Sequence, residues 1–278
     1  MAACGGGSGT KTHAVKADTL ITPHEGGGVV NVGGKLFSIP SPVQTALLIG
    51  KLHLPYLRDA ALSTDSIGKF ITKEKRALAL GVYGADMAYI TVNKDGQRAL
   101  KTMKAIEQLS TELNLQNAFN KELVEGFKKN VSNEDSLLRF TGMAYRAADT
   151  YLKTDRQEDV SALILAGGWI EGLYLTLAGS DAKVDPKIVD RIAEQRRSLD
   201  NLISLLQSSG DPGGLVSALK DLADSYSAVK STYSFHQPTL DAAKKTTYIN
   251  SVTTSEVAPA DLSQIVKKVR AIRSSITA

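Results

Sequence analysis

The chain is poor in the side chains that most often ligate metals or act as nucleophiles. It has one cysteine and four histidines among 278 residues, so no disulfide can form within it. His13, His24, His53 and His236 never stand three or four residues from one another or from Cys4. The helical spacing of paired metal ligands is therefore missing, and the sequence predicts neither a metal nor a cofactor.

An excess of charge of one sign is also missing. The chain carries 33 basic and 29 acidic side chains, for a net charge of +4, and only 6% of its residues are aromatic. This excess is too small to indicate nucleic-acid binding, and no basic stretch is interleaved with stacking rings. We therefore expect no nucleic-acid partner. The hydrophobic share of 42% is that of an ordinary globular protein.

Recognisable catalytic motifs are absent as well. The chain contains no nucleophile elbow, phosphate-binding loop or zinc-protease motif. The three glycines at 26–28 lack the lysine and the following helix that a phosphate site needs. With so few histidines, acid–base chemistry would fall on carboxylates. The sequence thus predicts a protein that is not an enzyme.

What the chain does have begins with a small-residue motif at its start. Ala2 and Ala3 precede Cys4, as in the bacterial lipobox, whose cysteine receives diacylglycerol. Met1 stands where that motif usually has leucine, and the charged and apolar parts of a signal peptide do not precede it. The Gly-rich residues after Cys4 suit a flexible tether. We expect residues 1–35 to be a lipid anchor and tether; the alternative is an ordinary flexible N-terminus that contains a cysteine.

Residues 36–278 are expected to form a single α-helical domain. Helix starts are marked by a capping residue before proline, as at Ser41-Pro42 and Asp211-Pro212. Apolar residues at helical spacing follow these signals. No repeat of about 34 residues appears, so an irregular multi-helix bundle is favoured over a helix-hairpin solenoid. The predicted helices are 42–52, 72–92, 95–113, 117–129, 133–153, 156–178, 185–208, 212–230 and 260–277.

Two segments favour β-structure instead. Residues 29–32 and 35–37 predict a short hairpin about Gly33-Gly34 near the N-terminus. The Thr-rich span 232–259 is the least helical part of the chain, and it predicts a long loop or a short β-pair through 246–249.

Two predicted helices, 77–92 and 160–178, are apolar on nearly every side. Such a helix lies in a membrane or at the centre of a bundle. Glu171 stands in the middle of the second helix, where a charge in a bilayer costs a few kcal/mol, so we expect both helices to form the core. Glycines that would let them approach closely are Gly81, Gly84, Gly167, Gly168 and Gly172.

Asp86 and Glu171 interrupt these apolar helices, and a buried carboxylate is costly unless it is paired. One interpretation is structural, with a helix end, a tyrosine or a basic residue as partner; the basic candidates are Arg76, Arg139 and Arg146. A second is a ligand pocket, and a third is a catalytic carboxylate pair. The candidate ligand-binding residues are Tyr83, Asp86, Trp169, Glu171 and Tyr174.

The last predicted helix has an apolar stripe at helical spacing, made of Leu262, Ile265, Val269, Ile272 and Ile276. Its basic residues are expected to form a solvated face; they are Lys267, Lys268, Arg270 and Arg273.

Three segments, 37–42, 79–89 and 167–174, occur in an order and composition that resemble an uncharacterised family of lipoproteins from Bacteroidetes-type bacteria. The resemblance implies an α-helical fold and a cell-envelope address, and it supplies no catalytic residues. We expect a protein anchored to the outer membrane by a lipid on Cys4, with its domain in the periplasm or at the cell surface. There it would bind another envelope protein or serve as a structural component. The alternative is a lipoprotein that binds a small ligand between its two central helices.

Overall fold

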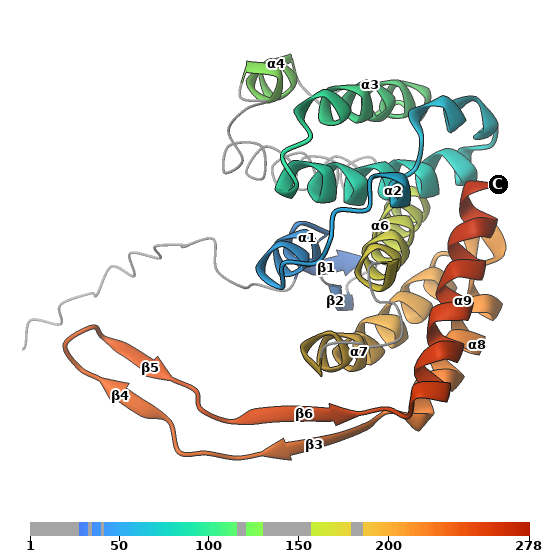
Figure 1. Ribbon diagram of the computed structural model, residues 1–278. Helices are drawn as coiled ribbons and strands as arrows, with labels where there is room; N and C mark the ends of the chain where they lie inside the picture. Colours follow the sequence, from blue (N-terminus) through green and yellow to red (C-terminus); the bar gives the residue numbers. More distant parts are fainter. Residues whose placement is uncertain (1–27, 33–34, 40–41, 116–120, 130–156, 179–185) are drawn as a thin grey trace, which may run out of the picture.

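The computed structural model of the chain describes residues 28–32, 35–39, 42–115, 121–129, 157–178 and 186–278. These residues are mostly helical, which confirms the predicted all-α, irregular multi-helix fold (Figure 1). Cys4, most of the predicted tether and the predicted helix at 133–153 lie outside the described residues.

The described helices follow the predicted boundaries to within a few residues, with one exception near residue 230. They are α1 (Pro42–Lys51), α2 (Lys73–Val92), α3 (Gly96–Glu112), α4 (Lys121–Lys129), α6 (Glu158–Ala178), α7 (Pro186–Ser208), α8 (Val216–Ser225) and α9 (Pro259–Thr277). Short 3₁₀ turns lie at Arg58–Ala60, Thr64–Lys69, Pro212–Gly214 and Tyr226–Ala228.

The two apolar helices, α2 and α6, pack against each other at the centre of the fold (Figure 1). Helices α1 and α3 contact α2, helices α7 and α9 contact α6, and α8 lies against α7 and α9. Helix α6 is long and apolar enough to cross a membrane, yet 89% of its most apolar stretch is buried inside the protein. Its apolar surface is therefore used by the other helices, as expected of a core helix.

Backbone contact between α2 and α6 depends on two glycines. A Cβ atom on Gly81 would lie 2.1 Å from the Ile164 carbonyl oxygen, and one on Gly167 would lie 2.1 Å from the Leu78 carbonyl oxygen. Both distances are far shorter than a van der Waals contact. The clashing atoms belong to the backbone, so they cannot move away as a flexible side chain could. Gly172 was expected at the same contact, but it faces Thr45 of α1 with ordinary spacing.

The helices around this pair bury the stripes that their spacing predicts. The predicted stripe of α9 is buried along its whole length, and so is the α7 stripe that runs from Ile188 to Leu206. Helix α7 ends just before Gly210, whose φ of +82° is the left-handed conformation that ends many helices. The amide of Asp211 closes this end with a hydrogen bond to the Leu206 carbonyl.

Two hairpins complete the part of the fold that the structure describes. Strands β1 (Gly28–Val32) and β2 (Lys35–Ile39) pair antiparallel with Val32 opposite Lys35, which confirms the predicted N-terminal hairpin. The second hairpin lies between α8 and α9 and contains β3 (Lys230–Ser234), β4 (Thr239–Asp241), β5 (Thr246–Tyr248) and β6 (Val252–Glu256). We call residues 230–256 the arm.

The arm corrects two predictions. The helix expected at 212–230 ends at Ser225, because the chain turns through Tyr226–Ala228 and enters a strand at Lys230. The expected loop or short β-pair in the Thr-rich span is a long two-stranded ribbon, in which β3 pairs with β6 and β4 pairs with β5. Threonine and tyrosine favour extended backbone over helix, and they recur on both sides of the ribbon.

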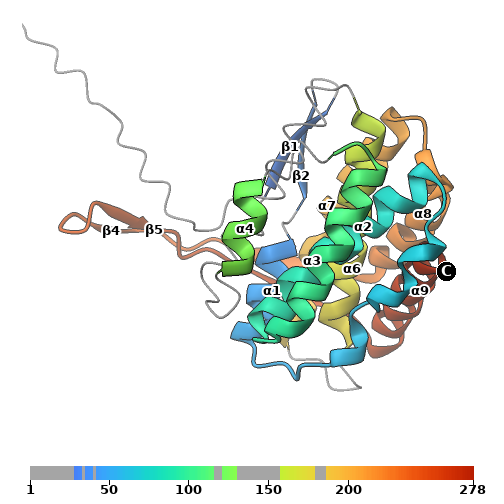
Figure 2. The same ribbon diagram turned by 90° about the horizontal axis from the view of Figure 1, so that it is seen from above.

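The arm projects away from the helices in two perpendicular views (Figures 1 and 2). Its two ladders are out of step by one residue, because residues 235–238 oppose only residues 249–251 between them. Side chains bridge this break. The Asn250 side-chain amide donates to the Gln237 carbonyl oxygen at 2.8 Å and to the Thr239 hydroxyl at 2.8 Å, and the His236 amide donates to the Ser251 hydroxyl at 3.2 Å.

We expect Gly167→Ala to destabilise the protein by about 1–3 kcal/mol, because the new methyl group would push α6 away from α2. Gly172→Ala is the matched control in the same helix. It should be neutral or stabilise by up to about 1 kcal/mol, since alanine favours helix and the space exists. Urea denaturation of both variants measures the difference, and equal effects would contradict the proposed backbone contact.

Candidate functional site

The two carboxylates singled out by sequence both lie at the centre of the fold. Asp86 on α2 and Glu171 on α6 have no exposed surface. Each sits on a helix whose other faces are apolar, so neither side chain can reach water by turning outward. Burial removes the water that would stabilise their charged forms, and each carboxylate must find its partners inside the protein.

Glu171 finds its partner on the last helix. Arg273 donates from Nε to Oε2 of Glu171 at 3.0 Å and from Nη2 to Oε1 at 3.3 Å. This is the two-bond arrangement in which a guanidinium matches a carboxylate in both shape and charge. The Arg273 side chain keeps only 16% of its surface exposed. The pair therefore ties α9 to α6 inside the core.

Asp86 has fewer partners. Its Oδ2 accepts a hydrogen bond from the Leu62 amide at 3.0 Å, while its Oδ1 has no hydrogen-bond partner among the described residues. Burial raises the pKa of Asp86 well above its usual range, and the nearby Glu171 carboxylate raises it further. Burial also raises the pKa of Glu171, but Arg273 opposes that effect. The favoured charge state is an ionised Glu171 paired with Arg273, beside a protonated Asp86.

Around these groups lies an irregular stretch of chain between α1 and α2, which we call the 57–63 segment. Only residues 60–62 of this segment are buried, and buried backbone donors and acceptors need hydrogen-bond partners. Side chains from α2, α3 and α9 bind the backbone along the segment. The contacts are Leu57 amide to Tyr89 Oη at 2.8 Å, Arg98 to the Arg58 and Ala61 carbonyls, Arg273 to the Ala60 carbonyl at 3.3 Å, Leu62 amide to Asp86, and Tyr83 Oη to the Ser63 carbonyl at 2.9 Å.

The two candidate tyrosines belong to this same network. Tyr83 is fully buried, packs edge-on against Phe70 and donates its hydroxyl proton to the Ser63 carbonyl. Tyr174 lies under the guanidinium of Arg273, whose carbon is 4.7 Å from the ring centre. This geometry allows a cation–π contact. Tyr174 thus contacts the buried charge of Arg273, whereas Tyr83 holds the 57–63 segment.

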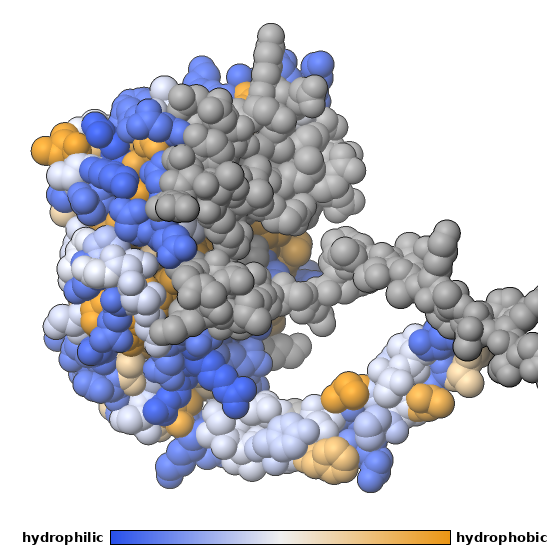
Figure 3. Space-filling model, turned by 180° about the vertical axis from the view of Figure 1, so that it is seen from behind, coloured by the Kyte–Doolittle hydropathy of each residue, from blue (hydrophilic) through white to orange (hydrophobic). Residues whose placement is uncertain are grey.

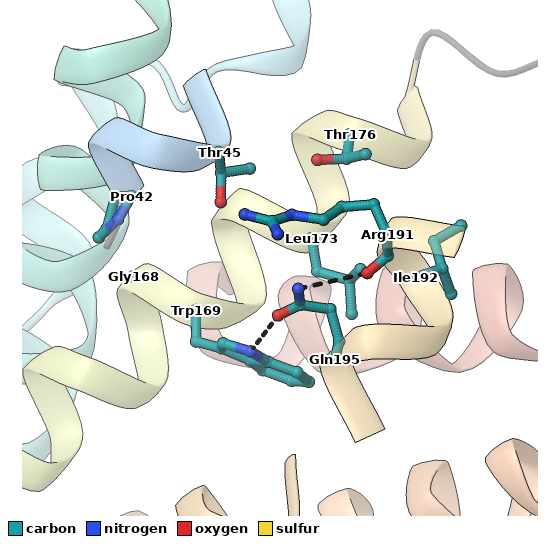
Figure 4. Close-up of a pocket in the computed structure, with 9 residues that line it drawn as sticks. All are labelled: Pro42, Thr45, Gly168, Trp169, Leu173, Thr176, Arg191, Ile192 and Gln195. Carbon is teal, nitrogen blue, oxygen red and sulfur yellow. Dashed lines mark hydrogen bonds between the residues drawn. The ribbon is translucent and has the colours of Figure 1, made fainter. Parts of the chain in front are cut away.

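Trp169 is the exception, because it points to another side of α6 (Figure 4). Its indole Nε1 donates to Gln195 Oε1 at 3.0 Å. The ring lines a crevice between α1, α6 and α7 with a volume of about 20 Å³, room for about one water molecule. Its other lining residues are Pro42, Thr45, Gly168, Leu173, Thr176, Arg191, Ile192 and Gln195. Neither Asp86 nor Glu171 opens into this crevice.

The structure therefore brings together four of the five candidate residues and separates Trp169 from them. It also corrects the expected partner of the acids. Arg76 binds Glu112 at 2.7 Å, Arg139 and Arg146 lie outside the described residues, and Arg273 points into the core from a helix face expected to be solvated. Arg273 follows Val269 by four positions and precedes Ile276 by three, so it borders the buried stripe. This spacing is the sequence feature that could have indicated that Arg273 points toward the core.

A buried cluster of this kind has limited chemical use. The ionised carboxylate is bound on both oxygens by Arg273, and neither Asp86 nor Glu171 has any exposed surface. Among the described residues, no group of three or more potential ligands could hold a metal ion. The network is arranged to position helices, which is the structural interpretation of Asp86 and Glu171.

The feature best placed for contact with another molecule is the arm. Five of the eight large hydrophobic side chains exposed in the described chain stand on it. They are Tyr233, Phe235, Leu240, Tyr248 and Ile249. Figure 3 shows hydrophobic groups on the arm, standing clear of the helical body. Sequence analysis missed this surface because the Thr-rich span was expected to be a loop or a short β-pair.

Removing one member of the buried ion pair should destabilise the fold strongly. We expect Arg273→Met to cost about 3–5 kcal/mol, because it leaves the Glu171 charge buried and unpaired. The double variant Glu171→Met/Arg273→Met should cost less than Arg273→Met alone, since no stranded charge remains. A double-mutant cycle by chemical denaturation measures this. Additive losses would show that the two side chains do not act as a pair.

The protonated state of Asp86 predicts a pH dependence. The unfolded carboxyl titrates near pH ~4, whereas the folded one titrates higher. The native state therefore holds the extra proton, and this part of the stability is lost as pH rises through the folded pKa. Asp86→Asn, which cannot ionise, should flatten this fall in melting temperature as pH rises above the titration range of the unfolded carboxyl. Asp59→Asn, at an exposed position, is the control and should leave the fall in place.

No protein-family model, no curated protein and no solved structure matches this chain.

Proposed function

We propose that the protein is a non-enzymatic, lipid-anchored component of the bacterial cell envelope that binds another envelope protein through its arm. The observation that carries the proposal is the exposure of the arm. Leu240 and Ile249 keep 75% and 72% of their surface exposed, and Phe235 keeps 62%. Clustered exposed apolar groups of this kind mark interaction sites, because water contact costs free energy that a partner would relieve.

The arm also has the residue composition of a contact surface. Residues 230–256 contain three lysines and two acidic residues, so little charge repulsion would oppose a partner. The cores of interfaces are poor in charge and rich in tyrosine and phenylalanine, and the arm has both rings among many threonines. Its base is held to the body by the Ser255 amide, which donates to Asp190 Oδ1 at 2.7 Å.

The proposed anchor rests on the start of the sequence. Ala2-Ala3-Cys4 matches the end of a lipobox, and the glycines that follow suit a tether. Several acyl chains on one cysteine would give stable attachment. The outer membrane is the proposed site, with the helical domain in the periplasm or at the cell surface. A tethered domain with a projecting arm can reach a partner in the same membrane.

Binding of a small ligand between α2 and α6 has less support. The two central helices are in backbone contact, and the crevice at Trp169 is about 20 Å³, far below the ~300 Å³ of typical ligand pockets. The binding surface that remains in the described chain is the arm.

The proposal is tested in the native host with a photo-cross-linking amino acid in place of Phe235. We expect one discrete adduct with another envelope protein in the membrane fraction, and its loss when Leu240→Ser and Tyr233→Ser are added, because these remove apolar contact area. Cys4→Ser should move the protein to the soluble fraction and reduce the adduct. The identified partner is then purified, and its affinity for the protein with and without the arm substitutions is measured.

The matched control places the cross-linker at Ile71, which is on the helical body and is also 72% exposed. It should give no such adduct. Equal labelling from Ile71 and Phe235 would show that the arm has no special role in binding. An unmodified Cys4 in membrane-bound protein, seen by intact-mass analysis, would rule out the lipid anchor.

A further inference from the structure

We propose that the envelope partner binds the arm by strand addition, in which an extended segment of the partner pairs with the open edge of β3. This pairing rests on the proposed function and adds to it the kind of segment that the arm recognises. The edge runs along residues 231–235, from the base of the arm to the break between its two ladders. A segment with apolar side chains at alternate positions fits this edge.

Hydrogen bonds at the base of the arm identify the backbone groups of β3 that point outward. The Ser255 N–H donates to Asp190 Oδ1 at 2.7 Å, so it does not bond to Ser231, the residue opposite it in the ladder. Ser231 and Ser255 therefore form a non-hydrogen-bonded pair, in which the N–H and C=O groups of each residue point away from the other strand. The next pair of this kind along the ladder is Tyr233 with Thr253.

The same alternation continues to Phe235. His236 points inward, because its N–H donates to the Ser251 hydroxyl at 3.2 Å and its carbonyl accepts from that hydroxyl at 3.3 Å. Successive residues of a strand direct their backbone groups to opposite sides, so those of Phe235 point outward, like those of Ser231 and Tyr233. The edge thus presents a row of alternating donors and acceptors. In the part of the chain that the structure describes, no second strand lies beside them.

The β3 edge is also the accessible edge of the ladder. Residues 231–240 are all exposed. Strand β6 lies between β3 and helix α7 (Figure 1), and its contacts with α7 and with Asp190 cover part of its own outer edge. A strand of another protein can therefore approach β3 without displacing the helices that the structure describes.

The sequence of this edge carries no device that would keep another strand away. Edge strands are often protected by lysine, by proline or by a bulge, whereas residues 231–235 read Ser-Thr-Tyr-Ser-Phe, with neither a charge nor a proline. Pro238 lies in the break, and its missing N–H ends the edge there. Because an isolated two-stranded ribbon is marginally stable in water, a third strand would also stabilise the arm.

Two aromatic rings define the side chains that the partner segment should carry. Tyr233 and Phe235 stand two residues apart, so both rings lie on one face of the arm, and both are exposed. A strand added beside β3 places every second side chain of the partner next to one of these rings. Aromatic residues pair favourably with aromatic or β-branched residues across strands. We therefore expect such residues at alternate positions of the partner segment.

The first test compares prolines on the two edges of one ladder, with the purified protein that is captured at Phe235 as the probe. Ser231→Pro removes an outward donor of β3 and spares the ladder, because this N–H takes no part in it. It should raise the Kd about tenfold or more. Thr253→Pro, which removes an outward donor from the opposite edge, should change the Kd by less than about twofold. Equal effects of the two prolines, or no effect of either, overturn the strand addition.

The second test examines the partner segment. The segment cross-linked to Phe235 is mapped by mass spectrometry and synthesised as a peptide, which should bind the arm. N-methylation of alternate amides should abolish binding in one register, where the methyl groups face β3, and be tolerated in the other. A peptide that does not bind, or that tolerates or fails in both registers, overturns the proposal.

The identity of the adduct separates the two proposals. An adduct with a second copy of this chain or with lipid overturns both, and so does the absence of any adduct. If an envelope protein is captured and binds the Ser231→Pro variant as tightly as the unchanged chain, the strand addition is wrong and the proposed function stands.

Discussion

The fold depends on one buried ion pair that joins parts of the chain about a hundred residues apart. Glu171 belongs to the central helix α6 and Arg273 to the last helix α9, and the pair is bound through both carboxylate oxygens. Neither charge could be buried alone, because the loss of hydration would exceed what packing returns. The two charges can therefore be buried only when α6 and α9 pack against each other. This requirement determines where the C-terminal helix α9 lies.

The same pair organises what surrounds it. Arg273 also binds the Ala60 carbonyl, and Asp86 binds the Leu62 amide, so an irregular segment between α1 and α2 is held from two sides. Burial and the nearby Glu171 carboxylate both raise the pKa of Asp86, which favours its protonated form at this position. Since β6 leads directly into α9, the network that anchors α9 also fixes the base of the arm.

Periodicity predicted most of the helices, because an amphipathic stripe such as that of α9 depends only on nearby residues. It also placed Asp86 and Glu171 in the core, since both interrupt apolar helices. Their partner could not be predicted in the same way. No feature of the sequence around Arg273 identifies Glu171, about a hundred positions away, as its partner. The arm was underestimated because each of its strands is short, and strand pairing depends on residues far apart in the sequence. Trp169 shared a helix with Glu171, yet a helix turns neighbouring residues to different sides.

The one-residue offset between the two ladders of the arm has a mechanical consequence. Four residues oppose three at this point, and only side-chain bonds from Asn250 and Ser251 connect the strands. Such bonds are few and lie in water, so they open at far lower free energy than a continuous ladder. The arm should therefore bend most easily at this break between its two ladders. Its distal half can swing to follow a curved or moving surface while its proximal half keeps the orientation set by the body.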